Sequence, residues 1–335
     1  MLQRFMALIL VGGLVLGAGA WAGAAQKAAP KATDEPDDGI QGVYQGADAL
    51  KAVSVMDEAK VIGQGGGEFK VMLTTGRDRR PVELAGKLEG GKVALMGAGG
   101  ESGTIADKKL SVTVGDKKYE LAYKVIKPPS LGQKPPAGAV VLLPFEEGKK
   151  TNLDAWVALK GGPATWVPQE DGSVLIMGGG DIQTKQEFTN VVLHVEFRCP
   201  YMPAARGQGR GNSGVYLQSR YEVQVLDSFG LAPKDNECGG LYSVATPKVI
   251  ASLPPARWQT YDITFHAPTV ENGKIVKPAT MSVAHNGIQI HRDVKIDHVT
   301  TAGVGGPIKS PAPLMLQDHG NPVRFRNIWL VELKD

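Results

Sequence analysis

The sequence predicts an all-β protein, in which a two-sheet antiparallel sandwich or jelly roll follows a small β-rich accessory domain. The 335 residues include 43 Gly and 22 Pro, which leave little room for long helices. Short apolar runs alternate with turns rich in Gly, Asn and Asp along most of the chain. No helical pattern lies between the short apolar runs in the C-terminal part of the chain, which argues against a fold of alternating strands and helices.

The first 25 residues predict a signal peptide. Arg4 supplies a positive charge, residues 5–16 are apolar, and small residues at 22–25 suit cleavage. The apolar run is too short and too rich in Gly for a membrane span of roughly 20 residues, and an uncleaved anchor is the alternative. We therefore expect export to the periplasm or the extracellular space, with no membrane span after removal of the signal.

Residues 26–38 predict a disordered linker, because their Ala, Lys, Pro and Asp side chains cannot bury enough apolar surface. Residues 39–127 predict the accessory domain, since runs such as 69–73 and 93–96 are bounded by turns typical of hairpins. Within it, only residues 47–60 have helical potential. The Pro-rich residues 128–137 predict a stiff, extended linker.

Residues 138–335 predict the larger domain, because their strand pattern is stronger. Residues 191–197 alternate apolar and polar side chains, as expected of a strand with one buried face. Asn286-Gly287 predicts a two-residue hairpin turn, since both residue types tolerate positive φ. The other expected strands are residues 214–220, 221–226, 258–266, 280–284, 288–291 and 324–331.

The charge balance and the cysteines restrict the possible partners. There are 37 Lys and Arg against 34 Asp and Glu, and no basic cluster interleaves with aromatics, so a nucleic-acid partner is not expected. Cys199 and Cys238 could form a disulfide in an oxidising compartment, although their spacing does not show that they meet. No cofactor is expected, and no metal ligands are predicted. A structural or catalytic divalent metal stays open, because a site of carbonyls and Asp leaves no readable pattern.

The strand expected at 221–226 contains the first candidate site residues. Side chains alternate between the faces of a strand, so Glu222 and Gln224 share one face. A β-bulge around Val225-Leu226 would turn Asp227 to that same face. The expected result is a row of Glu, Gln and Asp along a concave sheet, where paired carboxylates could act on a glycosidic bond. The alternative is that these groups only solvate an outer face.

A second segment, residues 316–328, concentrates polar groups between apolar anchors. Gln317 and Asp318 offer planar groups that suit sugar hydroxyls, and His, the residue type at position 319, is the side chain whose ordinary pKa lies near neutrality. The alternative is a hydrogen-bonded turn in which Asp318 orients His319. Tyr216 is expected to share a strand face with Gln218 and Arg220, and is the candidate for stacking on a sugar ring.

Several motifs occur in the order expected of the 3-keto-disaccharide hydrolase family. They are Asn212-Ser-Gly, Tyr221-Glu-Val-Gln-Val-Leu-Asp, Cys238-Gly, Trp258-Gln-Thr-Tyr-Asp, Asn286-Gly and Leu316-Gln-Asp-His-Gly-Asn-Pro-Val-Arg-Phe-Arg-Asn-Ile-Trp. The chain resembles this family over about residues 140–333. The resemblance implies a concanavalin-like jelly roll with the ligand on its concave sheet. Laminarinase-type glycosidases of similar fold carry Glu-x-Asp-x-x-Glu, whereas this chain has an amide, Gln224, in the middle, which argues against double-displacement hydrolysis.

The resemblance also implies a substrate with a ketone at C3, which makes the C2 hydrogen acidic. One base at C2 and one acid at the glycosidic oxygen could then expel the aglycone by elimination, with water added afterwards. The candidates for these catalytic roles are Glu222, Asp227 and His319. The candidates for substrate binding are Asn212, Tyr216, Gln218, Arg220, Gln224, Gln317, Asp318 and Arg324.

The expected partner is therefore an oligosaccharide or glycoside whose ketone a separate sugar oxidoreductase has made. The alternative function is that of a non-catalytic, lectin-like protein that binds a glycan on the same surface.

Overall fold

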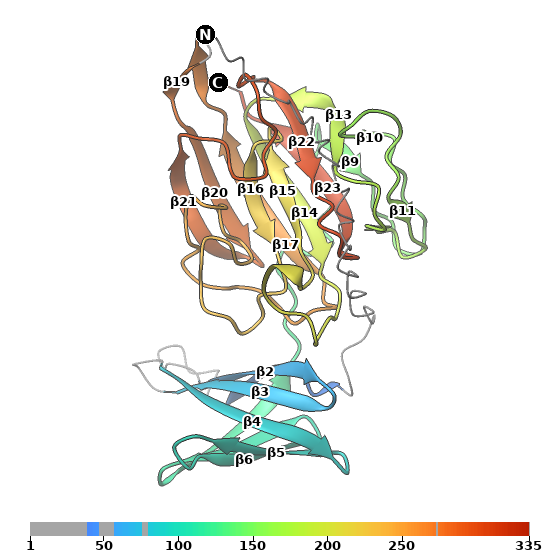
Figure 1. The fold of residues 1–335 in the computed structure, drawn as a ribbon. Helices are drawn as coiled ribbons and strands as arrows, with labels where there is room; N and C mark the ends of the chain where they lie inside the picture. The colour runs from blue at the N-terminus through green and yellow to red at the C-terminus, as the bar shows by residue number, and fades with distance from the viewer. Residues whose placement is uncertain (1–38, 47–56, 76–79, 273, 335) are drawn as a thin grey trace, which may run out of the picture.

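The computed structural model describes residues 39–46, 57–75, 80–272 and 274–334, and these are almost wholly β (Figure 1). The predicted signal peptide and the linker at 26–38 lie outside the described residues. A 3-10 helix spans only Gly207–Gly209. None of the helices in the described ranges has the length and apolar content needed to span a bilayer. The predicted all-β class is confirmed.

The first eight strands form a closed barrel. The barrel closes because β1 (Gly42–Gly46) pairs with both β2 (Glu58–Gly65) and β8 (Lys117–Lys124). In β3 (Glu68–Thr74) every second side chain is buried, as the period of a strand requires. The remaining barrel strands are β4 (Pro81–Glu89), β5 (Lys92–Gly97), β6 (Ser102–Ala106) and β7 (Lys109–Val114).

The helical potential of residues 47–60 is not realised at its C-terminal end. Glu58, Ala59 and Lys60 belong to strand β2, in which Ala59 and Val61 are buried in the barrel core. Tertiary packing of these alternating apolar side chains overrides the weak local preference for a helix. Residues 47–56 lie outside the described residues.

The remaining strands form two main antiparallel sheets with one shared core. The smaller sheet has the order β10 (Trp156–Ala158), β13 (Ile182–Phe188), β22 (Ala312–Leu316), β15 (Ser213–Leu217), β16 (Tyr221–Val225). The larger has the order β11 (Val167–Pro168), β12 (Val174–Leu175), β23 (Arg324–Glu332), β14 (Val191–Arg198), β17 (Gln259–His266), β20 (Ala279–His285), β21 (Ile288–Ile296), and β9 (Val140–Leu143) also pairs with β23. A short ribbon joins β18 (Thr269–Glu271) and β19 (Lys274–Lys277).

The shared core is built from the inward faces of both sheets. Val215 and Val223 come from the smaller sheet, and Val195, Ile263 and Phe325 come from the larger. All five side chains are fully buried. The opposite faces of the strands therefore remain for polar groups, and on the smaller sheet these include the candidate site residues.

The Pro-rich linker at 128–137 is docked on the larger sheet, on the face opposite the core. Ser130 Oγ donates to Asp262 Oδ2 at 2.7 Å, and the Gly132 amide donates to Glu196 Oε1 at 2.6 Å. The carbonyl of Gln133 accepts hydrogen bonds from Asn327. The linker thus covers Glu196, whose buried carboxylate needs such donors.

Two hairpin turns show where the local sequence does and does not reveal a turn. Asn286 and Gly287 adopt φ of 52° and 79° between β20 and β21, so the predicted turn is confirmed. The strand expected at 214–220 instead ends at Leu217, because Gln218 and Ser219 adopt φ of 50° and 55° and form the turn between β15 and β16. Neither Gln nor Ser is a residue type that commonly adopts positive φ, so the sequence does not predict this turn.

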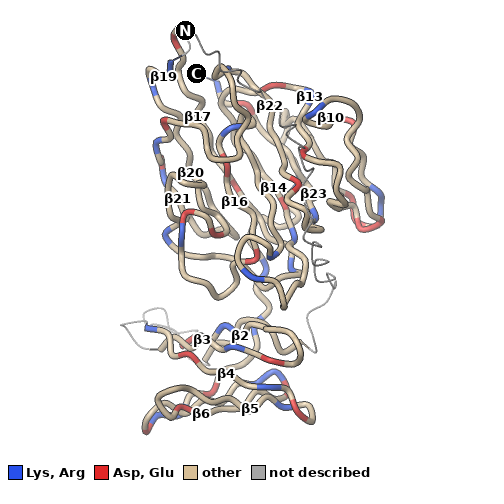
Figure 2. Tube along the Cα trace, in the orientation of Figure 1, with Lys and Arg blue, Asp and Glu red and all other residues tan. Residues whose placement is uncertain are grey.

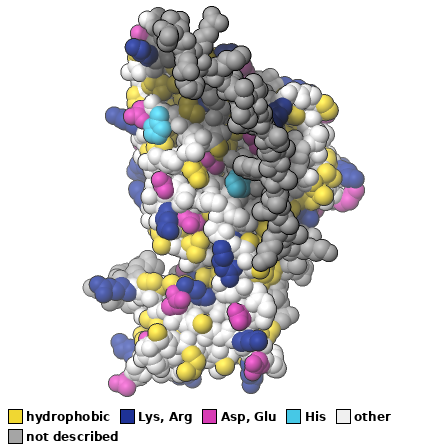
Figure 3. Space-filling model, in the orientation of Figure 1, with side chains coloured by type: hydrophobic (Ala, Val, Ile, Leu, Met, Phe, Trp, Pro, Cys, Tyr) yellow, Lys and Arg dark blue, Asp and Glu magenta, His cyan; other side chains and the backbone are white. Residues whose placement is uncertain are grey.

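Basic and acidic residues are interspersed along both parts of the described chain (Figure 2). On the face seen in Figure 3, hydrophobic, basic and acidic side chains are likewise mixed rather than gathered by type.

Candidate active site

The hairpin β15–β16 places Tyr216, Glu222 and Gln224 on the face of the smaller sheet that points away from the core. Tyr216 pairs with Glu222 and Gly214 pairs with Gln224. The intervening residues point into the core, so the strand period fixes the direction of these polar side chains. Glu222 and Gln224 therefore share one face, while both remain at least 98% buried, with exposed fractions of 2% and 1%.

A chain of hydrogen bonds ends on the Glu222 carboxylate. Gln317 Nε2 donates to Tyr216 Oη at 3.0 Å, and the Tyr216 hydroxyl donates to Glu222. Burial raises the pKa of Glu222 to about 7, and the Tyr216 hydrogen bond opposes this rise. Burial and the neighbouring Glu222 in turn raise the pKa of Tyr216. Glu222 can therefore take up or release a proton near neutral pH, which suits an acid or a base in catalysis.

Gly214 makes room for this arrangement. A Cβ at position 214 would lie 2.6 Å from both Glu222 Oε1 and Tyr216 Cε2. Any larger residue would push apart the two groups that form the hydrogen bond. The Gly of the Asn-Ser-Gly motif is thus required by close approach rather than by a turn.

A second group of amides lies beside Glu222. Gln208 Oε1 accepts from Gln224 Nε2 at 3.0 Å and from Asn212 Nδ2 at 3.1 Å. The amide oxygens of Asn212, Gln224 and Gln317 are buried and have no hydrogen-bond partner among the described residues. Buried acceptors of this kind are normally paired, so these three oxygens suit the hydroxyl donors of a ligand. Gln208 was missed from the sequence because it lies in a Gly-rich segment without strand periodicity.

Two carboxylates and His319 gather at the start of β13. The Asp318 amide donates to Asp181 Oδ1 at 2.8 Å, and the Gly180 amide donates to Asp318 Oδ2 at 3.0 Å. Burial and the charge of Asp318 raise the pKa of Asp181, whereas His319 lowers it. Asp181 also acts electrostatically on Tyr216, which connects this group to Glu222. His319 itself is exposed.

Asp181 is a second residue that sequence reasoning missed. It directly precedes the alternating strand β13, but its partner Asp318 is 137 residues further along the chain. The contact arises because β13 pairs with β22. A single sequence carries no signal for that strand pairing.

Residues 139–331 match the model of the family described as the 3-keto-alpha-glucoside-1,2-lyase-like domain. The chain belongs to this family. The matched residues contain Asp181, Gln208, Tyr216, Glu222 and the other groups described above, while the barrel precedes them. The lyase-like domain is thus the part of the chain that holds the candidate site.

The solved structures similar to this chain include proteins of Parabacteroides distasonis ATCC 8503 named as candidate glycosyl hydrolases. One has 36% sequence identity and a TM-score of 0.53, and the match covers 59% of this chain and 85% of the other. Another has 18% identity and a TM-score of 0.42, covering 59% and 95%. No curated protein matches the chain. The family and the first of these structures support a carbohydrate-active, hydrolase-like function.

The structure pairs Asp227, the last member of the predicted row of Glu222, Gln224 and Asp227, with a cation. The register between β15 and β16 is regular up to the pair of Ser213 and Val225, and β16 ends at Val225, where the bulge is predicted. Val225 and Leu226 both enter the core of the lyase-like domain, and the strand ends there. Asp227 is instead buried against Arg210, whose Nε lies 2.7 Å from Asp227 Oδ2.

The ion pair with Arg210 offsets the cost of burying the Asp227 carboxylate. Burial raises the pKa of Asp227, and the Arg210 guanidinium opposes the rise. A carboxylate with no access to water needs a cation or several donors, and Arg210 together with the Phe229 amide supplies them. The lyase-like domain thus holds Asp227 as the partner of Arg210.

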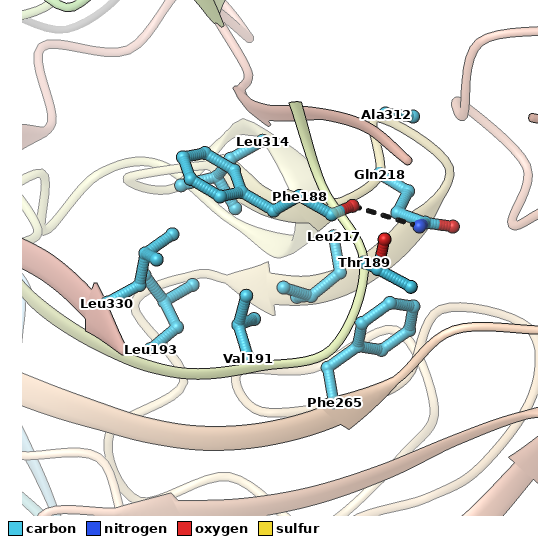
Figure 4. A pocket seen from close by; sticks show the side chains of 10 residues that line it. All are labelled: Phe188, Thr189, Val191, Leu193, Leu217, Gln218, Phe265, Ala312, Leu314 and Leu330. Carbon is cyan, nitrogen blue, oxygen red and sulfur yellow. Dashed lines mark hydrogen bonds between the residues drawn. The ribbon is translucent and has the colours of Figure 1, made fainter. Parts of the chain in front are cut away.

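Gln218 and Arg220 do not share the face of Tyr216, since the chain turns between them. Gln218 Nε2 donates to the Phe188 carbonyl at the edge of a small apolar cavity of 10 Å³ (Figure 4). That volume is about the space of one water, too small for a sugar. Arg220 donates to the Pro307 carbonyl and so holds a neighbouring loop.

Arg324 lies on the other sheet of the lyase-like domain. It begins β23, and its Nη1 lies 3.2 Å from Asp171 Oδ2. Because β23 belongs to the larger sheet, Arg324 is not brought to the Tyr216–Glu222 face. The segment 316–328 is thus divided between the two sheets: Gln317 donates to Tyr216 and Asn321 Oδ1 accepts from the Asn212 amide, whereas Arg324 begins β23.

The two cysteines are buried and free. Cys238 Sγ lies 3.1 Å from Tyr261 Oη within the core. Across the described residues, no three His, Cys, Asp or Glu side chains are grouped so that they could hold a metal ion.

Proposed function

We propose that this protein is an exported enzyme that cleaves 3-keto-glycosides by elimination followed by hydration. The observation that carries the proposal is Glu222, a buried carboxyl with a pKa of about 7 that receives a hydrogen bond from Tyr216. Family membership supports the substrate class. The predicted signal peptide supports export, and a separate oxidoreductase would supply the ketone.

In the proposed reaction, Glu222 removes the C2 proton of the sugar. The electron pair of the C2–H bond forms the enolate of the C3 ketone, and it then forms the C1–C2 double bond as the C1–O bond breaks. His319 protonates the departing glycosidic oxygen. Water finally adds across the double bond, with its oxygen at C1 and its hydrogen at C2. A positioned base or acid of this kind typically contributes about 10²–10⁴-fold to a rate.

The amides and Asp181 have supporting roles in the proposal. The unpaired oxygens of Asn212, Gln224 and Gln317 accept hydrogen bonds from sugar hydroxyls. Asp181 interacts electrostatically with both Asp318 and His319, which places the two carboxylates near the proposed acid. Asp227 holds Arg210 in place and has no chemical step.

The test is release of a chromogenic aglycone from a 3-keto-glucoside. Wild-type protein should release it, and Glu222→Gln should lower kcat by roughly 10²–10⁴-fold. Glu332→Gln is the matched control, since Glu332 is exposed at the end of β23, and it should retain wild-type activity. If Glu222→Gln turns over at the wild-type rate, Glu222 is not the base.

The same unpaired amide oxygens would also suit a lectin-like protein, which is the second candidate function. A binder needs no group that titrates near pH 7. Wild-type protein that retains a glycan in a pull-down assay but releases no aglycone at any pH would favour this second function over the enzyme.

A further inference from the structure

The barrel contacts two loops that are hydrogen-bonded to Gln224 of the candidate site. Loop A is residues 199–212, which contain Gln208, Arg210 and Asn212. Loop B is residues 226–240, which follow β16 and run back beside it, since the Gln224 amide donates to the Gly240 carbonyl. In Figure 1, β2 is on the side of the barrel that faces these loops and β6 is on the far side.

Loop A meets the barrel at strand β2. Gly63 lies against Tyr201, and a Cβ at position 63 would be 2.6 Å from the Tyr201 hydroxyl. Arg206 Nη2 donates to Gln64 Oε1 at 3.0 Å. Gly65 lies against the backbone of Pro203 and Ala204. Three successive contacts on one strand thus hold the first half of loop A.

Loop B contacts β2 and its neighbour β1. Phe229 is 1% exposed and forms a separate hydrophobic cluster with Val43 and Ile62 of the barrel. Lys60 Nζ lies 5.9 Å from the centre of the Phe229 ring. Gly230 packs so closely that a Cβ there would overlap Ile62 Cδ1. The barrel therefore encloses an aromatic side chain that belongs to the lyase-like domain.

A chain of hydrogen bonds connects Phe229 to the amide side chains of the candidate site. The Phe229 amide donates to Asp227 Oδ1 at 3.3 Å, and Asp227 Oδ2 pairs with Arg210 of loop A. The Asp227 amide donates to the Arg210 carbonyl. Gln208 then joins the two loops, because its Nε2 donates to the Asn236 carbonyl while its Oε1 accepts from Gln224.

We propose that the barrel is a positioning domain, which fixes loops A and B so that the amides of Gln208, Asn212 and Gln224 are held ready for the sugar. Loop A has only one short 3-10 helix, and ordering such segments is entropically costly unless other contacts offset it. The proposal rests on the proposed function for its effect on turnover. Glu222 lies on the strand itself, so its chemistry should not depend on the barrel.

The experiment inserts one methyl group at the contact and then makes room for it. Gly63→Ala pushes on the Tyr201 hydroxyl, and Gly63→Ala/Tyr201→Phe removes that hydroxyl. Gly103→Ala is the matched control, because its Cβ would collide with the Ser111 carbonyl within the barrel, far from both loops. Each full-length variant is compared in hydrogen exchange of loops A and B and in steady-state kinetics on the chromogenic 3-keto-glucoside.

We expect Gly63→Ala to speed amide exchange in both loops at least tenfold, with β15 and β16 unchanged. Its kcat/KM should fall roughly tenfold, mainly through KM, since displaced binding groups impair substrate positioning. The pH profile of kcat should stay as in wild type. The Tyr201→Phe change should restore both exchange and KM to within threefold, and Gly103→Ala should alter neither.

Unchanged loop exchange in Gly63→Ala would overturn the proposal, as would an equal loss of kcat/KM in Gly103→Ala. A wild-type protein that is inactive on the substrate, with loop exchange as expected, would instead refute the proposed function alone. If Gly63→Ala does not fold, Arg206→Ala tests the same contact from an exposed position. Loop A exchange that matches wild type in that variant would again overturn the proposal.

Discussion

At the scale of single residues, Glu222 owes its raised pKa to burial, and the Tyr216 hydroxyl partly offsets it. A hydrogen bond donated to a carboxylate stabilises its charged form, so its removal makes the carboxyl harder to ionise. Tyr216→Phe should therefore move the acidic limb of the pH profile of kcat to higher pH. At pH 6 we expect roughly a tenfold loss of kcat, with a smaller loss at pH 8.5.

The control for this variant is Tyr119→Phe, which removes a hydroxyl from strand β8 of the barrel. Its pH profile should follow that of the wild type. A Tyr216→Phe profile with the same acidic limb as wild type would mean that the hydroxyl does not tune Glu222.

Asp227 offers a contrast, since its carboxylate is buried against Arg210. Asp227→Asn leaves the guanidinium buried without a counter-charge, and breaking such a pair typically costs about 3–5 kcal/mol. We expect a loss of that order in the free energy of unfolding, measured in urea. A stable variant that has lost only turnover would instead restore Asp227 as a catalytic group.

At the scale of strands, Gly214 of β15 determines how closely Tyr216 and Glu222 approach. Gly214→Ala should destabilise the domain by about 1–3 kcal/mol, as overpacked sites do, and should lower kcat along with it. The control is Gly305→Ala, since a Cβ at position 305 meets no atom within 4 Å. Urea unfolding and kinetics of both variants would check this, and equal behaviour would contradict it.

The linker docked on β14 and β17 predicts a pH dependence of stability. Burial lowers the pKa of His194, but two carboxylates outweigh this effect: His194 Nδ1 donates to Asp262 at 2.7 Å, and Glu196 lies 3.6 Å from its Nε2. The pKa of His194 in the folded protein therefore lies above the ordinary value of 6.5. Because the pKa of His194 is higher in the folded than in the unfolded protein, protonation of His194 stabilises the fold. This contribution is complete below pH 6.5 and is lost as the pH rises through the pKa of His194 in the folded protein.

The measurement is urea unfolding of wild type and His194→Gln at a series of pH values. Wild type should lose stability as the pH rises from 6 to 9, and the variant should lose less. Parallel curves for the two proteins would assign the pH dependence to other groups.

Much of the strand-level structure could be predicted from the sequence, and the reasons are local. Glu222 and Gln224 share a face because a strand has a period of two, and Asn286-Gly287 forms a turn because both residues tolerate positive φ. The turn at Gln218-Ser219 could not be predicted, because its conformation is imposed by the pairing of β15 with β16. For the same reason Asp181 was missed and Arg324 was misplaced, since both depend on which strands are neighbours.

At the scale of the whole molecule, the barrel and the two sheets have separate hydrophobic cores, and the small cluster around Phe229 lies where they meet. Leu73 is fully buried in the barrel core. Leu73→Ala should cost about 2–5 kcal/mol, and the loss should fall on the barrel. In calorimetry we expect one transition to move to lower temperature while a second stays within a few degrees.

Ile263→Val, a milder change in the other core, provides the comparison, because it should move the second transition instead. A single transition that shifts as a whole in both variants would show that the two cores unfold together and that the contact at Phe229 couples them fully.

The strand order also determines when folding can finish. β22 lies between β13 and β15, and β23 lies between β12 and β14, so the last two strands of the described chain occupy the interior of both sheets. During synthesis each sheet would remain split into halves with bare inner edges until these strands emerge. The closed barrel has no such dependence, because all eight of its strands precede them. The later part of the chain would therefore expose unpaired edges during synthesis, and such edges are prone to pair with other chains.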